Sequence, residues 1–149
     1  MFRNQKITDD IYYVGVNDRQ KAKFENLIPL YDGVSYNAYL IVDEKTALID
    51  TVDIHFGEIL IQKILSQLGD KGLDYLIINH MEPDHSGSLR LLRKYFPNMT
   101  IVGNERTLSM VKGFYEIDGS LLKVSDEESL SLGRHQLQFF LTPMVHWPE

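Results

Sequence analysis

The order of strand-like and helix-like segments restricts the fold of this 149-residue chain more than any other feature. A first strand is predicted at residues 11–16, followed by a hairpin at 36–42 and 45–49 that turns around Asp43 and Glu44. Helices at 57–68, 86–96 and 104–112 then alternate with strands at 75–78, 100–102, 121–124 and 137–141. An antiparallel opening followed by alternation predicts an α/β fold with a mixed sheet and flanking helices, in one domain over residues 1–149.

The predicted helices carry start and stop signals. The helix at 57–68 has an apolar stripe at helical spacing and is ended by Gly69. Its stripe consists of Leu60, Ile61, Ile64, Leu65 and Leu68. Ser86 is predicted to cap the next helix, which Pro97 stops. The stripe indicates a helix that packs against the sheet through one face.

Composition excludes several kinds of protein. The formal net charge is −6, from 21 acidic and 15 basic residues, and no Lys/Arg-rich run is present, so no nucleic-acid surface is expected. The absence of cysteine excludes disulfides, thiolate metal sites and thiol nucleophiles. The first twenty residues lack the apolar core of a secretory signal, and no apolar stretch could cross a bilayer. A soluble cytoplasmic protein that makes no membrane contact is expected.

Four potential metal ligands fall within six residues, directly after the apolar strand at 75–78. The segment reads His80-Met81-Glu82-Pro83-Asp84-His85. If it stays extended, His80, Glu82 and Asp84 share one side, and Pro83 disfavours helix at the residue before it. His80 and Asp84 would then be about 13 Å apart along the backbone, so their side chains converge more easily on two metals than on one. A dinuclear site is the favoured interpretation, and the alternative is that these residues only solvate a turn.

The ligand types point to iron, and a distant histidine completes the set. Two histidines and one carboxylate with open positions are associated with non-haem iron. His80 and Glu82 supply two of these ligands, and His146 follows the strand at 137–141. If both strands end at the same edge of a sheet, the two histidines meet there, because ligands gather outside the carboxyl ends of strands.

The order His-x-Glu-x-Asp-His, with glutamate where zinc-dependent metallo-β-lactamase-fold hydrolases have a second histidine, resembles the flavodiiron proteins, or A-type flavoproteins. The resemblance extends over nearly the whole chain, through residues 35–41, 48–53, 78–87 and 142–148. It implies the αββα sandwich of the metallo-β-lactamase superfamily and a centre of two non-haem iron ions. Such enzymes reduce dioxygen to water, nitric oxide to nitrous oxide, or both.

The resemblance also implies roles for individual residues. His80, Glu82 and His146 correspond to ligands of one iron, and Asp84 and His85 to ligands of the other. Trp147 corresponds to a residue that shields the site or faces an approaching flavin, although an ordinary core aromatic is the alternative. The family takes electrons through FMN from a donor such as rubredoxin or a flavin reductase.

The family pattern is longer than this chain. A bridging aspartate, a further histidine and a flavodoxin-like FMN domain would follow Glu149, so the chain is expected to be the amino-terminal part of the metal domain. Half a sandwich would expose apolar surface, and two copies are expected to pair as a homo-oligomer. Two alternatives stay open: a zinc hydrolase of the same fold, and an inactive half-domain that is stable only by pairing.

Several polar and aromatic residues outside the ligand segment have either a structural or a functional interpretation. Asp50 follows a buried-looking strand and could orient a metal-binding histidine by accepting its hydrogen bond, or could only close the turn. His55 and His135 are both predicted to be solvated loop residues. Tyr36 and Tyr39 are predicted to be core or sheet-face residues rather than catalytic acids.

Overall fold

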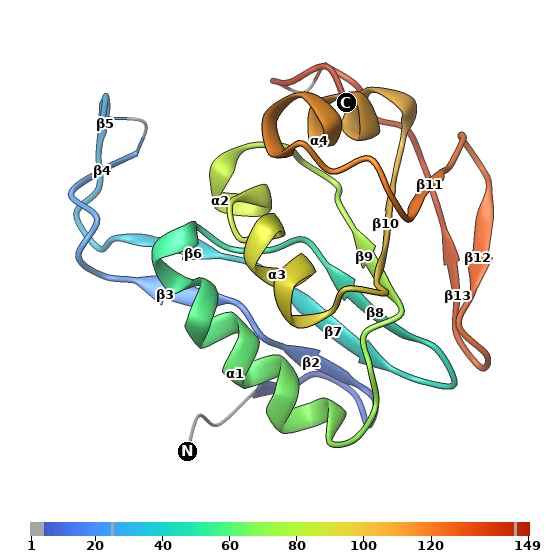
Figure 1. The fold of residues 1–149 in the computed structure, drawn as a ribbon. Coiled ribbons are helices and arrows are strands. Elements are labelled where there is room, and N and C mark those ends of the chain that lie inside the picture. The colour runs from blue at the N-terminus through green and yellow to red at the C-terminus, as the bar shows by residue number, and fades with distance from the viewer. Residues whose placement is uncertain (1–4, 25, 145) are drawn as a thin grey trace.

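A computed structural model describes residues 5–24, 26–144 and 146–149, and its centre is a seven-stranded mixed sheet (Figure 1). Strands β1, β2, β7 and β8 pair antiparallel, whereas β8, β9, β10 and β11 run parallel. In sheet order the strands are β1 (Gln5–Lys6), β2 (Ile11–Tyr13), β7 (Tyr39–Val42), β8 (Thr46–Ile49), β9 (Tyr75–Ile77), β10 (Thr100–Gly103) and β11 (Leu121–Lys123). The predicted mixed sheet is confirmed, and so is the hairpin that turns between Val42 and Thr46.

Helices connect the parallel strands and lie mainly on one face of the sheet (Figure 1). They are η1 (Ile54–Phe56), α1 (Gly57–Leu68), α2 (Pro83–Ser86), α3 (Leu89–Tyr95) and α4 (Glu105–Tyr115). α1 has the predicted bounds, and α4 runs beyond its predicted end at Lys112. The predicted cap at Ser86 is wrong: Ser86 ends α2, and its hydroxyl donates to the carbonyl oxygen of Met81 at 2.8 Å, while Ser88 precedes α3.

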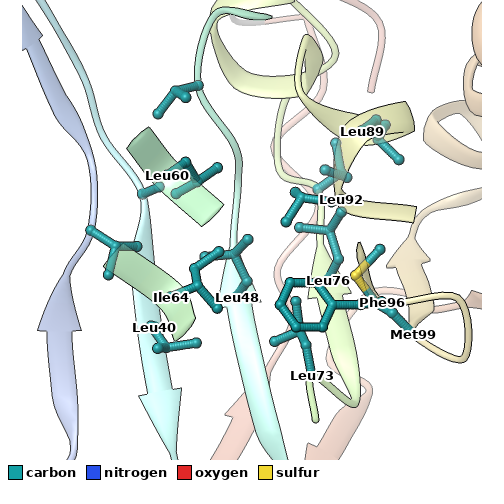
Figure 2. Packing of buried hydrophobic residues seen from close by; sticks show 14 of the residues in the cluster. Leu40, Leu48, Leu60, Ile64, Leu73, Leu76, Leu89, Leu92, Phe96 and Met99 are labelled. Atoms are coloured by element: carbon teal, nitrogen blue, oxygen red, sulfur yellow. The ribbon is translucent and has the colours of Figure 1, made fainter. Parts of the chain in front are cut away.

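Side-chain alternation along the central strands builds a core on each face of the sheet. On the helix face, Leu48 of β8 and Leu76 of β9 pack with Leu60 and Ile64 of α1 and Leu92 of α3 (Figure 2). All five side chains are fully buried. Burying one such side chain contributes about 1.5–3 kcal/mol, so this face holds α1 and α3 in place. Leu65, which the apolar stripe included, is instead 42% exposed.

Part of the opposite face of the sheet is covered by a β-hairpin that follows β11. Strands β12 (Ser129–Ser131) and β13 (Gln136–Gln138) pair antiparallel, and Leu132 in their connection is fully buried. Leu132 packs with Ala47, Ile77 and Val102, whose side chains alternate with those of the first core. This hairpin forms the second layer of the sandwich, and Phe140, Leu141 and Met144 after it are exposed.

An ion cluster fastens this hairpin to the main sheet. Asp43, between β7 and β8, is buried, and its Oδ2 accepts a hydrogen bond from the backbone nitrogen of His135 and lies 2.7 Å from Nδ1 of the same residue. Arg134 lies between two aspartates, 3.3 Å from Asp43 and 3.1 Å from Asp10. His135 lies in a loop, as predicted, but its ring pairs with buried Asp43 and is not simply solvated. The sequence does not reveal this contact, because 92 residues separate the partners. His55 is exposed, as predicted.

The first predicted strand and the first arm of the hairpin are each broken in two. After β2, the backbone nitrogens of Val14 and Gly15 both donate to the carbonyl oxygen of Ala38, which bends the chain away from the main sheet. β3 (Val16–Asp18) then pairs with β6 (Val34–Tyr36), and β4 (Lys23–Phe24) pairs with β5 (Ile28–Pro29). A Cβ at Gly15 would clash with the carbonyl oxygen of Tyr36, so this close approach requires glycine. No helix among the described residues is long and apolar enough to span a membrane.

Candidate metal centre

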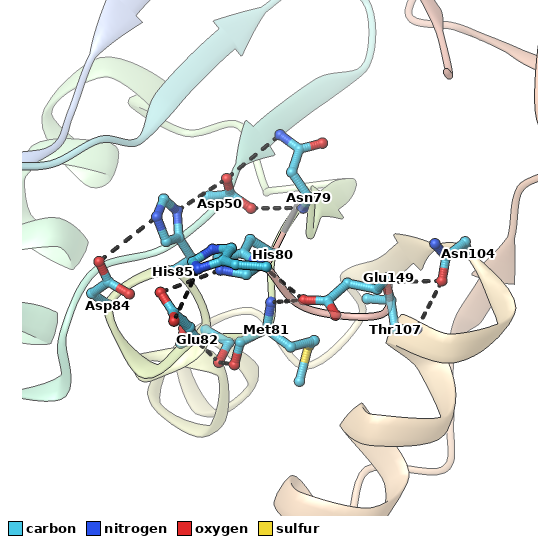
Figure 3. A network of polar contacts seen from close by, with 12 residues as sticks. Asp50, Asn79, His80, Met81, Glu82, Asp84, His85, Asn104, Thr107 and Glu149 are labelled. Atoms are coloured by element: carbon cyan, nitrogen blue, oxygen red, sulfur yellow. Dashed lines mark hydrogen bonds and ion pairs between the residues drawn. The ribbon is translucent and has the colours of Figure 1, made fainter. Parts of the chain in front are cut away.

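The predicted ligand segment leaves the carboxyl end of β9, at the centre of the parallel part of the sheet. β9 lies between β8, which is followed by Asp50, and β10. The carboxyl ends of parallel strands open onto a common edge, where ligands usually bind in α/β folds. Figure 3 shows the polar side chains gathered there, from Asp50 and Asn79 across His80 and His85 to Glu149.

The segment is extended only as far as Glu82. Glu82 has φ −56° and ψ 146°, and Pro83 opens the short helix α2, so the predicted extended path to Asp84 is wrong. Proline restricts the residue before it to extended backbone, but its own fixed φ suits the first position of a helix. The Glu82 carbonyl oxygen accepts from the backbone nitrogens of His85 (2.8 Å) and Ser86 (2.9 Å). Asp84 and His85 therefore reach the site from a helical turn.

Three of the predicted ligands lie together. His80, Glu82 and His146 each offer a ligand atom, and these atoms lie within 4.8 Å of one another. Nε2 of His80 is 3.2 Å from Oε2 of Glu82, and Nδ1 of His146 is 3.7 Å from Oε1 of Glu82. The two imidazole rings stack with centroids 4.5 Å apart. A buried carboxylate thus lies beside two imidazoles, the donor set that suits non-haem iron.

The predicted route of His146 to this cluster is only partly correct. β13 belongs to the separate two-stranded sheet and ends at Gln138, so the two histidines do not come from neighbouring strands of one sheet. His146 instead follows an irregular segment after β13 and lies at the edge of the main sheet where the parallel strands end. Val145 lies outside the described residues. His146 is about half exposed, whereas Glu82 is only 6% exposed.

A buried nitrogen of His80 supports the fit of these residues to a metal ion. Its Nε2 is shielded from solvent and makes no hydrogen bond to the described residues, although Glu82 is only 3.2 Å away. Nε2 of His80 and Oε2 of Glu82 are close enough for an ion pair, but their geometry is not that of a hydrogen bond. Buried polar atoms are normally satisfied, and a cation shared between this nitrogen and the Glu82 carboxylate would satisfy both groups.

Asp84 and His85 form a second pair next to the first cluster. Nε2 of His85 is 3.7 Å from Oδ2 of Asp84, and its Nδ1 is 3.3 Å from Oδ2 of Asp50 (Figure 3). The hydrogen bond with Asp50 raises the pKa of His85, an effect that burial opposes. The ring of His85 lies 5.4 Å from that of His80, so the two sets of potential ligands adjoin.

Asp50 orients His85, as one of the two sequence interpretations proposed. Oδ1 of Asp50 also accepts from the backbone nitrogen of Asn79 at 2.7 Å, so the aspartate joins the ends of β8 and β9. The φ of Asp50 is +55°, a left-handed conformation that aspartate tolerates better than most residues. Asp50 therefore both closes the turn and holds a histidine.

Sequence reasoning did not identify Glu149. Its Oε1 accepts from the backbone nitrogen of Met81 at 2.7 Å and lies 2.9 Å from Nδ1 of His80. Its side chain is 1% exposed, and Oε2 is buried without a hydrogen-bond partner among the described residues. The one feature of the sequence that could have indicated this role is that Glu149 is a carboxylate three residues after the predicted ligand His146. Trp147 packs edge-on to His80, with centroids 5.6 Å apart, and also contacts the main core.

Comparisons with protein families and with curated relatives show which proteins this chain resembles. The family model described as ODP family beta lactamase matches residues 34–149. The chain is 40% identical to a nitric oxide reductase of Moorella thermoacetica and 35% identical to an anaerobic nitric oxide reductase flavorubredoxin of Vibrio vulnificus. Each match covers 96% of this chain but only 36% and 30% of those proteins. The chain thus spans about a third of the length of these relatives.

Solved structures carry the same fold. Rubredoxin oxygen:oxidoreductase from Desulfovibrio gigas matches with a TM-score of 0.92 and 35% identity, over 98% of this chain and 37% of that one. The flavodiiron protein from Giardia intestinalis also matches with a TM-score of 0.92, at 31% identity, over 99% of this chain and 36% of that one. The expected metallo-β-lactamase-like fold is therefore confirmed. The chain belongs to the ODP family of β-lactamase-fold domains, the family of the flavodiiron proteins.

Proposed function

We propose that residues 1–149 supply part of the metal-binding domain of an oxidoreductase that reduces dioxygen to water, nitric oxide to nitrous oxide, or both. The observation that carries the proposal is the convergence of His80, Glu82 and His146, whose ligand atoms lie within 4.8 Å of one another. Relatives named as nitric oxide reductase and as rubredoxin oxygen:oxidoreductase support this class of reaction. Glutamate at position 82 favours iron over the zinc of a hydrolase, because it replaces an imidazole.

The proposed centre holds two iron ions. His80, Glu82 and His146 would bind one, and Asp84 and His85 would bind the other. Three carboxylate–imidazole pairs with separations of up to 3.7 Å support this division. Iron bound there would supply electron exchange and binding of the diatomic gas.

The residues around the centre would keep these ligands in place. Asp50 would hold Nδ1 of His85, so that Nε2 of that ring faces Asp84. The Trp147 ring, packed on His80, would shield one side of the centre and present an aromatic surface to an FMN group carried elsewhere in the parent protein. A rubredoxin or a flavin reductase would reduce that FMN, and a second copy of the chain is the proposed oligomeric partner.

Metal analysis tests the proposal directly. The 149-residue chain would be reconstituted anaerobically with ferrous iron, desalted, and analysed for bound iron and zinc. We expect bound iron in the wild type, reduced binding in His80→Ala and His146→Ala, and unchanged binding in His55→Ala. His55 is a matched control because it is an exposed histidine that pairs with Asp53 outside the cluster.

Two outcomes would overturn this assignment. Equal iron binding by the wild type and the His80→Ala variant would show that the cluster is not the site. Stoichiometric zinc retained in preference to iron, with metal-dependent ester hydrolysis, would instead favour the zinc hydrolase interpretation. Consumption of dioxygen and nitric oxide would then be measured in the parent protein with a flavin and a reductant.

A further inference from the structure

Glu149 is the most deeply buried carboxylate beside the proposed centre and is not one of its proposed ligands. Its side chain is 1% exposed, against 6% for Glu82 and 13% for Asp84. Removing a carboxylate from water is costly unless it accepts hydrogen bonds from the protein. Among the described residues, Glu149 accepts one from the backbone nitrogen of Met81 at 2.7 Å, and its other close polar contact is Nδ1 of His80 at 2.9 Å.

The contact with His80 determines which ring nitrogen carries the proton. An ionised carboxylate can only accept a hydrogen bond, so the imidazole must be protonated at Nδ1 for the contact to be favourable. In the neutral ring, Nε2 is then left with its lone pair. Nε2 is the atom that lies 3.2 Å from Glu82, buried and without a hydrogen bond to the described residues.

The same carboxylate also fixes the direction of the ring. Oε1 of Glu149 contacts both the backbone nitrogen of Met81 and the side chain of its neighbour His80 (Figure 3). This one oxygen therefore links the ligand segment to the segment after His146. Rotation of the imidazole would break the 2.9 Å contact and would leave Glu149 with only the Met81 hydrogen bond. A fixed tautomer and a fixed orientation are the two properties that a carboxylate partner confers on a metal-binding histidine.

We propose that Glu149 is a positioning residue, which holds His80 as the Nδ1-protonated tautomer with Nε2 directed at Glu82 and His146. It raises the affinity of this cluster for a divalent metal without binding the metal itself. The inference rests on the proposed metal centre, but the tautomer of His80 can be measured without any metal.

Two readouts test this role in the 149-residue chain. Long-range nitrogen-15 NMR of the imidazoles in the metal-free protein reports which nitrogen of His80 is protonated. Competition with a chromophoric chelator gives the affinities for Co²⁺ and Zn²⁺. We expect a predominantly Nδ1-protonated His80 in the wild type, a mixture of tautomers in Glu149→Ala, and affinity about 10- to 100-fold lower in that variant.

Glu149→Gln and Glu116→Gln serve as the conservative variant and the control. The glutamine keeps an acceptor oxygen but lacks the charge, so we expect affinity between those of the wild type and Glu149→Ala. Glu116 is an exposed glutamate paired with Arg90, and its substitution should change neither readout. If Glu149→Ala does not fold, as judged by circular dichroism, Glu149→Gln provides the comparison.

An unchanged His80 tautomer in the Glu149 variants would overturn the inference, and so would unchanged metal affinity in variants of a wild type that binds. If the wild type binds neither metal, the proposed centre fails instead, and the NMR comparison alone decides whether Glu149 positions His80.

Discussion

Oδ2 of Asp50 lies 3.3 Å from Nδ1 of His85, and the other oxygen of the same carboxylate accepts from the backbone nitrogen of Asn79 at 2.7 Å. Asp50, just after β8, thereby contacts both Asn79, which precedes the ligand segment, and His85, which ends it. Since His85 is a proposed ligand of the second iron, its orientation depends on a residue 35 positions earlier in the chain.

Replacing Asp50 by asparagine should weaken binding of the second metal. Asparagine tolerates the left-handed backbone at this position, so the variant removes charge with little strain. We expect a loss of about 10- to 100-fold in affinity for the metal that Asp84 and His85 would bind, measured by calorimetric titration with Co²⁺. Asp53→Asn is the control, because Asp53 pairs with exposed His55. Equal losses in both variants would contradict the role of Asp50.

The Asp43 cluster should make the fold sensitive to acid. Burial alone would raise the pKa of Asp43, but hydrogen bonds from His135, Glu44 and Arg134 outweigh it and hold the pKa well below its usual value of 3.8. Asp10 faces the same arginine and histidine. A depressed carboxylate pKa stabilises the folded state above the unfolded pKa, and this contribution is lost as the pH falls towards the folded value.

Thermal unfolding at a series of pH values measures this effect. At neutral pH, Asp43→Asn should unfold at a lower temperature than the wild type, and the difference should shrink as the pH falls below about 4. Asp9→Asn, which removes an exposed partner of Lys6, should have little effect on the unfolding temperature at neutral pH. A difference that stays constant down to about pH 3 would count against the ion cluster as its cause.

The helix-face core should be sensitive to a cavity at Leu48. This side chain is fully buried on β8, so Leu48→Ala should lower the free energy of unfolding by about 2–5 kcal/mol, measured by urea denaturation. Leu27→Ala removes the same atoms from a side chain that is 76% exposed, so it should change the free energy of unfolding by less than about 0.5 kcal/mol. Similar losses in both variants would contradict the packing of Leu48 against α1 and α3.

Two glycines should respond to alanine in opposite directions. Gly113 lies within α4, and a Cβ there would meet no atom within 4 Å, so Gly113→Ala should stabilise the protein by about 0.5–1 kcal/mol. Gly15→Ala should destabilise it, because its Cβ would clash with the carbonyl oxygen of Tyr36. Urea denaturation measures both, and a stabilised Gly15 variant would show that the bend after β2 can relax.

Local patterns predicted those parts of the fold that are determined by neighbours in sequence. The stripe of α1, the stop at Gly69 and the hairpin between β7 and β8 all follow from periodicity and turn residues. The breaks after β2 and before β7 were not predicted, because both halves read as β-structure. What separates them is the sharing of the Ala38 carbonyl by Val14 and Gly15, a contact between distant segments.

The candidate site also has features that local sequence predicts and features that depend on distant contacts. The ligand types were recognisable because they are concentrated at 80–85, and the position after a buried strand indicated the edge of the sheet. The contacts of His135 with Asp43 and of Glu149 with His80 were not predictable, because 92 and 69 residues separate the partners. The change to helix at Pro83 was missed because proline there fits both a loop and a helix start.

The position of Pro83 has a consequence for how this loop can vary. Before it, only every second side chain faces the site, whereas after it neighbouring side chains are turned by about 100° and two in succession can reach the same cluster. Inserting or deleting one residue between Glu82 and Asp84 would redirect every side chain that follows. The loop should therefore tolerate a conservative substitution of Met81, whose side chain is buried in the main core, more readily than any change in its length.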